Sequence, residues 1–230
     1  MATKAPRGML VSFTQPDAAH ESEHNEWFNR EHVDERVFTP GFTRSRRYEA
    51  IDAPFKYFAT YETETADVLS SDAYLKVVSN QSDWSKRVIP NLGKFHRMTT
   101  RVIVDRMHGI GGLAAAIRFY PPDDKGAKAK LRDHLDTAMA GLVKEPGMIG
   151  ACLCENMLDA ANRTGDAARA MGGALPRAER MEWLAVLEAA DLATLKNATW
   201  RLFNQAAVAA LGVAPAPLAG FYRFVYGNHR

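Results

Sequence analysis

The sequence contains the same order of elements twice, and this repetition constrains the fold more than any other feature. An apolar run closed by proline opens each half, as MLVSFTQP at 9–16 and as AAAIRFYPP at 114–122. Short apolar runs that end in proline are typical of strands entering a turn. A charged segment with helical periodicity follows each run and ends at a Pro-Gly pair, PGF at 40–42 or PGM at 146–148. We therefore expect both halves to adopt the same fold.

The remainder of each half continues the match. After each Pro-Gly pair comes a second predicted strand, FTRSRRYEA or MIGACLCEN. YFATYE at 57–62 then aligns with WLAVLE at 183–188, and a second predicted helix follows each of them. A last strand closes each half, KFHRMTTRVIV at 94–104 or GFYRFVYG at 220–227. The order β-α-β-β-α-β, which is the ferredoxin-like motif, is thus predicted twice.

These patterns predict an α+β fold made of two repeats, residues 1–107 and 108–230. A sheet of this type carries helices on one face, and the strand at 57–61 is apolar on both sides, so its other face must be covered as well. Packing the two sheets against each other would give an α+β barrel within one chain. The second repeat is degenerate and has an inserted loop at about 157–180, where a segment rich in Ala, Gly and Arg predicts either a surface insertion or a lid.

Composition excludes several classes of partner. The chain has 230 residues and a formal net charge of +2, with no basic surface pattern that would indicate nucleic acid. No run approaches the roughly 18 apolar residues of a membrane-spanning helix. Cys152 and Cys154 are too close to form a disulfide within one strand and too few to hold a metal, which predicts a reduced, cytoplasmic protein. We expect no metal, no cofactor, and either a monomer that imitates a dimer or a homodimer.

One segment of the first repeat carries a family resemblance. In NEWFNREHVDERVFTPGFTRSRRYE at 25–49, His32 is followed by seven residues, Pro-Gly and an arginine-rich strand. This pattern resembles the EthD-like branch of the dimeric α+β barrel superfamily, in which a cofactor-free lactone isomerase has a histidine at the corresponding place. The matching position of the second repeat is Ala138. The resemblance therefore implies one site per chain, in the first repeat.

His32 is the candidate catalytic residue. Histidine titrates near pH 7 and is the most frequent general acid or base. On a helix, Glu35 lies one turn after His32 and can hold the imidazole in one tautomer, while Trp27 and Phe28 can line a cavity. We predict that this cavity lies between the two sheets and that Trp27, Phe28 and Glu35 contribute to substrate binding. The alternative is that His32 caps a helix or bonds a backbone carbonyl.

Five further residues are candidates for substrate binding. Arg46 and Tyr48 share one side of the second strand, where a guanidinium can hold a carboxylate or stabilise an enolate oxygen. Tyr57 and Tyr61 share one side of the third strand, and either hydroxyl can donate to a substrate oxygen. His96, on the last strand of the repeat, can face the cavity. The alternatives are an ion pair at the sheet edge for the arginine, simple packing for the tyrosines, and solvent exposure for His96.

Two classes of function remain open. The first is a cofactor-independent enzyme that acts on a small aromatic or carbonyl compound by histidine-mediated proton transfer, as an isomerase, a lyase or decarboxylase, or a cyclase. Within this class, the alternative is an oxygen-dependent or haem-binding monooxygenase with His32 or His96 as the iron ligand. The second class is a non-catalytic stress-response barrel that binds a hydrophobic ligand. We favour the enzyme, because the resemblance implies a catalytic histidine that the fold alone does not.

Overall fold

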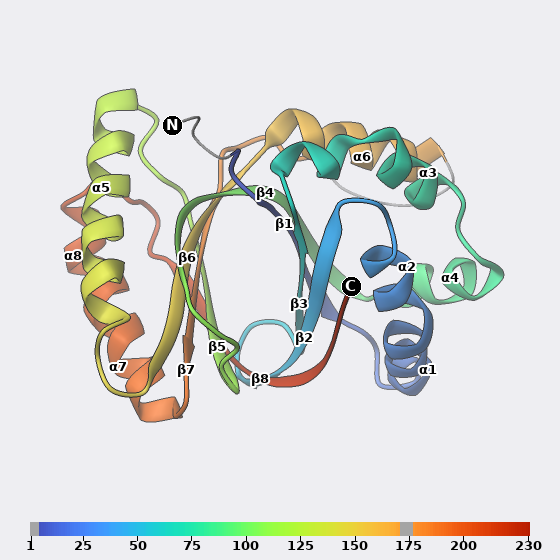
Figure 1. Ribbon diagram of the computed structural model, residues 1–230, viewed down its shortest axis with the longest axis horizontal. Helices are drawn as coiled ribbons and strands as arrows, with labels where there is room; N and C mark the ends of the chain where they lie inside the picture. Colours follow the sequence, from blue (N-terminus) through green and yellow to red (C-terminus); the bar gives the residue numbers. More distant parts are fainter. Residues whose placement is uncertain (1–4, 171–176) are drawn as a thin grey trace.

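The protein is described by a computed structural model that covers residues 5–170 and 177–230. Its centre is a closed antiparallel barrel with the strand order β1-β3-β2-β8-β5-β7-β6-β4 (Figure 1). The strands are β1 (Gly8–Gln15), β2 (Phe42–Asp52), β3 (Tyr57–Thr63), β4 (Lys94–Met107), β5 (Leu113–Phe119), β6 (Met148–Asn156), β7 (Trp183–Ala189) and β8 (Leu218–His229). The two four-stranded sheets join where β2 pairs with β8 and β4 pairs with β6. The predicted α+β barrel of two ferredoxin-like repeats within one chain is confirmed.

The helices lie outside the barrel in two groups, one on each side (Figure 1). The group beside the first-repeat strands contains α1 (Glu21–Trp27), η1 (Phe28–His32), α2 (Val33–Val37), η2 (Ala66–Ser70), α3 (Asp72–Ser79), α4 (Asp83–Val88) and η3 (Ile89–Asn91). The group beside the second-repeat strands contains α5 (Lys125–Leu142), α7 (Leu192–Phe203) and α8 (Gln205–Ala209). Among the described residues, none of these helices has the length and apolarity needed to cross a membrane.

The two Pro-Gly pairs form equivalent turns between helix and strand. Gly41 and Gly147 have φ angles of 85° and 83°, a left-handed conformation that glycine adopts without a steric penalty. The carbonyl of Gly41 accepts a hydrogen bond from the backbone N–H of Glu64 at 2.9 Å, and the carbonyl of Gly147 accepts one from Ala190 at 2.8 Å. The Pro-Gly part of the sequence pattern is therefore a structural requirement that both repeats share.

The interior of the barrel is a packed core. Side chains alternate along β1, so that Met9, Val11 and Phe13 point inward while their neighbours point toward the helices. An eight-stranded barrel is just wide enough to be filled by side chains. Here aromatic residues pack against small and aliphatic residues of both repeats: Tyr48, Phe58, Met98, Ala114, Ala116, Cys152, Cys154, Leu184, Val186 and Tyr222. The cysteines are free thiols. The predicted cavity between the two sheets is thus wrong, because this core occupies the space.

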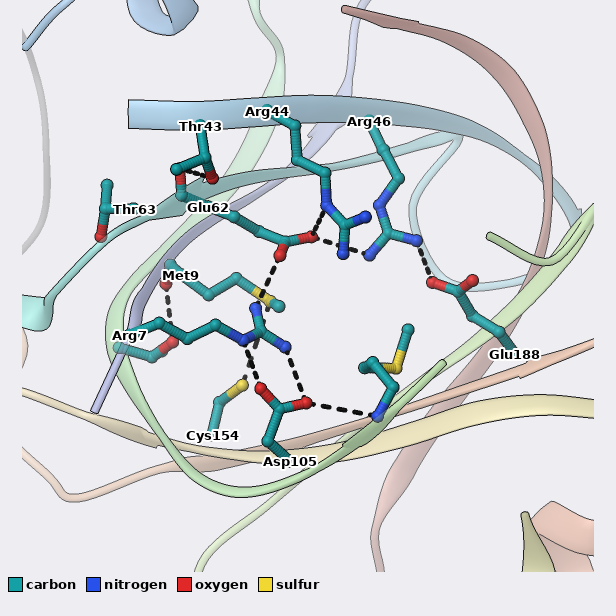
Figure 2. Close-up of polar contacts among 12 residues, drawn as sticks. Arg7, Met9, Thr43, Arg44, Arg46, Glu62, Thr63, Asp105, Cys154 and Glu188 are labelled. Atoms are coloured by element: carbon teal, nitrogen blue, oxygen red, sulfur yellow. Dashed lines mark hydrogen bonds and ion pairs between the residues drawn. The ribbon is translucent and has the colours of Figure 1, made fainter. Parts of the chain in front are cut away.

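A network of buried and partly exposed charged groups lies at one end of the barrel (Figure 2). Arg46 of β2 donates to Glu62 of β3 at 3.0 Å and also to Glu188 of β7. Arg7 donates to Glu62 at 2.7 Å and to Asp105 of β4 at 2.5 Å. Burial alone would raise the pKa of Glu62, but the surrounding guanidinium groups outweigh this effect and lower it. Because Glu188 belongs to the second repeat, Arg46 links the two repeats through charge.

Residues 158–170, which we predicted to be part of an inserted loop, form a helix instead. Helix α6 (Leu158–Ala170) is rich in alanine and arginine, which have high helix propensities, and this outweighs the cost of its glycine. It belongs to the second repeat but lies on the first-repeat helices, where it contacts η2 and α3 (Figure 1). The Thr164 hydroxyl bonds the carbonyl of Leu69 at 3.4 Å. The rest of the predicted loop includes residues 171–176, which lie outside the described residues.

Candidate active site

A cavity of about 390 Å³ lies between the outer face of the first-repeat sheet and the helices that cover it. His32 lines this cavity from the end of η1. Outward-facing residues of β1 and β3, including Leu10, Ser12 and Tyr61, form its base. Its apolar wall comes from the helices, their connections and β4: Trp27, Phe28, Tyr74, Val78, Ile89, Pro90, Leu92, Phe95 and Ala168. The imidazole of His32 therefore faces a cavity. This cavity lies on the outer side of the first-repeat sheet, whereas the prediction placed it between the two sheets.

A local irregularity in the helix positions His32. Between α1 and α2 the chain forms one π-helical segment, Phe28–His32, in which the backbone N–H of Val33 bonds the carbonyl of Phe28. A π turn adds one residue to the helical turn and so changes the direction of the side chains that follow. Such segments are rare and occur frequently at functional sites. Sequence periodicity gave no indication of this segment.

The imidazole of His32 is buried and uncharged. Its ring centroid lies 4.3 Å from that of Trp27, and the side chain is 15% exposed. Nδ1 is buried and has no hydrogen-bond partner among the described residues, of which Glu35 provides the nearest carboxylate, 3.9 Å away. Burial, reinforced by the charge of Arg36, lowers the pKa of His32 well below its usual value. The ring is therefore neutral at pH 7 and is available as a base.

Tyr61 supplies a hydrogen-bond donor next to His32. The two ring centroids are 5.8 Å apart and the rings are nearly perpendicular. The Tyr61 hydroxyl is buried without a partner in the part of the chain that the structure describes, and burial raises its pKa, so it stays protonated. A buried polar group without a partner costs about 1–3 kcal/mol. An acceptor atom of a ligand in the cavity would remove this cost.

Two guanidinium groups give the cavity a positive charge. Arg36 of α2 and Arg97 of β4 both line it. Arg36 donates to Glu35 at 2.9 Å and lies over the ring of Tyr74, with 5.7 Å between its Cζ atom and the ring centroid. Arg97 donates to the Tyr74 hydroxyl at 3.0 Å. A negative charge that forms on a ligand here would be stabilised by both groups.

The indole of Trp27 is fixed by one group from the adjoining η1 and one from α4. Its Nε1–H lies 3.1 Å from Oε1 of Glu31 and 3.0 Å from the hydroxyl of Ser85 on α4. Glu31 also accepts a hydrogen bond from the hydroxyl of Ser82 at 2.5 Å. Because Trp27 packs against His32, these contacts hold the wall of the cavity in place. Glu31 and Ser85 are far apart in the sequence, and neither belongs to a motif that would have identified them.

Four of the predicted site residues come together. His32, Trp27, Phe28 and Tyr61 line the same cavity. Glu35 lies behind the imidazole without lining the cavity, and burial raises the pKa of its carboxyl group. The sequence pattern and the fold thus place one aromatic cluster around one histidine.

The other four predicted site residues lie elsewhere. Arg46 and Tyr48 do share one side of β2, but that side faces the barrel interior. Tyr57 donates its hydroxyl to a carboxylate of α1 at 2.5 Å. His96 bonds a carboxylate of the second repeat at 2.9 Å. Arg97, the next residue, points to the opposite side of β4 and reaches the cavity, although no sequence motif marked it.

The corresponding space in the second repeat is filled. Leu131, Leu135 and Met139 of α5 are buried and pack against the second-repeat strands. These side chains fill the space between α5 and the second-repeat sheet. Ala138, at the position that matches His32, has no group that can exchange a proton. The cavity that contains His32 is therefore a property of the first repeat.

Comparison with known proteins supports the fold. No family model and no curated protein matches the chain. A structure of an anthrone oxidase-like protein matches with a TM-score of 0.67 at 14% identity, covering 99% of this chain and 94% of that one. A proposed monooxygenase from Lactobacillus acidophilus gives 0.61 at 9% identity, covering 97% and 96%. A haem-binding protein from Thermus thermophilus gives 0.52 at 11%, covering 96% and 92%. These likenesses show the dimeric α+β barrel fold; the EthD-like branch stays a prediction.

Proposed function

We propose that this protein is a cofactor-independent oxygenase that oxidises a small aromatic compound with an acidic C–H bond, with His32 as the general base. The observation that carries this proposal is a neutral, buried imidazole on the wall of a mostly apolar cavity, beside the unpaired hydroxyl of Tyr61. The names of two structural neighbours, an anthrone oxidase-like protein and a proposed monooxygenase, favour oxidation. They give no support to the isomerase or lyase reactions that we expected.

The proposed reaction uses only the substrate, oxygen and residues of the cavity. His32 removes a proton from a methylene group that an aromatic ring and a carbonyl group make acidic. The resulting anion is stabilised by hydrogen bonding to Tyr61 and by the charges of Arg36 and Arg97. The carbanion adds to O₂, the proton on His32 passes to the peroxide oxygen, and loss of water leaves a ketone. The balance is one methylene plus O₂ giving one carbonyl plus water.

Haem does not fit the residues of this site. A histidine that ligates a metal usually donates its other N–H to a carboxylate or carbonyl, whereas Nδ1 of His32 has no such partner. The indole of Trp27 lies against the imidazole of His32, with 4.3 Å between the two ring centroids. The volume of about 390 Å³ lies near the lower end of the roughly 300–1,000 Å³ of ligand pockets, which suits a small aromatic compound better than a porphyrin. His96, the other predicted iron ligand, is bonded to Glu182 instead.

The structure also bears on the oligomeric state and the cellular compartment of the protein. The barrel closes within one chain, so we propose that the protein acts as a monomer with a built-in dimer arrangement. Cys152 and Cys154 are free thiols in its core, which supports a reducing compartment, and we propose that this compartment is the cytoplasm.

The proposal is tested by turnover of anthrone under air and under argon. We expect formation of the quinone with consumption of one O₂ per product, and no product under argon. His32→Ala should lower kcat by roughly 10²–10⁴-fold, the usual contribution of a general base. His134→Ala, an exposed histidine of the second repeat, is the matched control and should keep full activity. Equal turnover without oxygen, or an unchanged rate in His32→Ala, would contradict the proposal.

A further inference from the structure

Arg97 lacks the partner that the other arginines of its strand have. On β4, Arg101 pairs with Glu155 at 2.5 Å and Arg106 pairs with Asp136 at 2.7 Å. Arg97 has no carboxylate within ion-pair distance among residues 5–170 and 177–230, and its partner is the neutral hydroxyl of Tyr74. A guanidinium in a partly buried, apolar site loses hydration and needs an anion or several acceptors in return.

The cavity itself offers Arg97 no negative charge. The described residues that line it include Arg36, Arg97 and His32 but no aspartate or glutamate. The charge of Arg36 is offset by Glu35, which lies outside the lining. The charge of Arg97 is therefore left for whatever occupies the cavity. In a cavity built only for a neutral hydrocarbon, a cation in this position would reduce affinity because the ligand could not replace its hydration.

Tyr74 makes the arrangement specific for an oxygen anion. Its hydroxyl oxygen accepts the hydrogen bond from Arg97, so its own hydrogen remains available to donate. Tyr74 lines the same cavity and is 1% exposed, which holds its ring in one position. Arg97 of β4 and Tyr74 of α3 thus place donors next to each other on the cavity wall. This combination matches the two oxygens of a carboxylate.

We propose that the ligand of this cavity is an aromatic carboxylate whose carboxylate group is bound by Arg97 and Tyr74. The proposal deepens the function proposed above and rests on it for the reaction, since the acid group would hold the ring while His32 acts on another carbon. Binding itself is independent of turnover. The carboxylate is not consumed, so no further reactant enters the balance.

Calorimetric titration of the full chain tests the proposal. The probes are benzoate, 1-naphthoate and 9-anthracenecarboxylate, each compared with its neutral amide. We expect at least one acid to bind about tenfold or more tightly than its amide. Arg97→Gln should weaken binding of that acid by roughly 10- to 100-fold, the range expected for a lost charged hydrogen bond, while the amide is unaffected. Arg101→Gln, a change on the same strand away from the cavity, should alter neither.

The outcomes separate the two proposals. Equal affinity for acids and amides, an equal loss of both in Arg97→Gln, or failure of all three acids to bind overturns the carboxylate site. Arg97→Lys keeps the charge and should recover part of the affinity, which excludes a general folding defect as the cause. Acid-selective binding in a protein that never consumes oxygen would leave the carboxylate site standing and remove the oxygenase. Oxygen-dependent turnover of neutral substrates in a protein that shows no preference for the acids over their amides would do the reverse.

Discussion

At the scale of single residues, the basicity of His32 is set by its surroundings. Burial and the charge of Arg36 make protonation of the imidazole unfavourable. The positive charges of Arg36 and Arg97, which disfavour protonation of the imidazole, favour ionisation of a substrate whose anion lies near them. A weak base can therefore remove the proton, because the substrate is made more acidic by the groups that make the base weaker. Sequence spacing identified the histidine, but these neighbours decide its chemistry.

The pH dependence of kcat/KM reports this environment. Because the pKa of His32 is lowered, the imidazole is the deprotonated base throughout the neutral range, and activity should be flat between about pH 6 and pH 8. Activity should fall only as the pH drops through the lowered pKa, below the usual histidine value of about 6.5. In Arg36→Gln one source of the lowering is gone, so this fall should move to higher pH. If the activity of the unsubstituted protein fell with a pKa at or above the usual histidine value, this would be evidence against His32 as the base.

Sequence patterns did not show which side of each strand faces the helices. Alternation along a strand correctly paired Arg46 with Tyr48, but it says which residues share a side and not which side faces the helices. For the same reason the sequence could not show whether His96 or Arg97 faces the cavity, because these adjacent residues point to opposite sides of β4. Resolving such a choice requires the packing partners of the sheet, which come from distant parts of the chain.

At the scale of elements, two segments build the cavity in ways that periodicity did not predict. The π-helical Phe28–His32 interrupts an otherwise regular helix and turns His32 toward the sheet. Helix α6, read from composition as a loop, covers the first-repeat helices and adds Ala168 to the cavity wall. The strands and the Pro-Gly turns were predicted well because they occur twice. The π turn and α6 have no counterpart in the other repeat, so repetition could not identify them.

Ala168 limits the size of the ligand from the side of α6. It is 4% exposed and lines the cavity, so a larger side chain there would project into the space. We expect Ala168→Leu to lower the affinity for three-ring aromatic ligands by roughly 10- to 100-fold, with little change for single-ring ligands. Arg163→Leu, an exposed change on the same helix, is the control. Titration with ligands of increasing ring number measures the effect, and a uniform loss across the series would show that Ala168 does not set the size limit.

At the scale of the whole molecule, the barrel is held closed by its apolar core and by the charges at one end. Arg46 lies between carboxylates of both repeats and is 2% exposed. The repeated sequence predicted that the two sheets would meet. It did not predict which space would remain open, because filling the barrel depends on the combined volumes of Phe13, Phe58 and Tyr222 with the small residues that face them. The cavity lies instead between the first-repeat sheet and its helices, which cover their sheet less completely than α5 covers the second-repeat sheet.

Removal of Arg46 should destabilise the fold strongly. Arg46→Met leaves Glu188 buried without its guanidinium partner, and breaking such a buried pair costs about 3–5 kcal/mol. Arg223→Met breaks an exposed pair with Glu49 and should cost less than about 1 kcal/mol. Urea unfolding measures both free energies. The triple change Arg46→Met, Glu62→Gln and Glu188→Gln should recover part of the loss. A cost for Arg46→Met no larger than that of the control would show that this network does not hold the repeats together.

The placement of α6 has a consequence that a pair of identical subunits could not reproduce. In a symmetric homodimer, every insertion appears on both subunits, and a roof over one site is also a roof over the other. In this chain the two halves are fused, so an insertion in one half need not appear in the other. Here the second half supplies α6, which covers the site, while the first half contains the cavity itself. A substitution in α6, such as one at Ala168, can therefore reshape the cavity without altering the strands and helices that carry His32 and its neighbours.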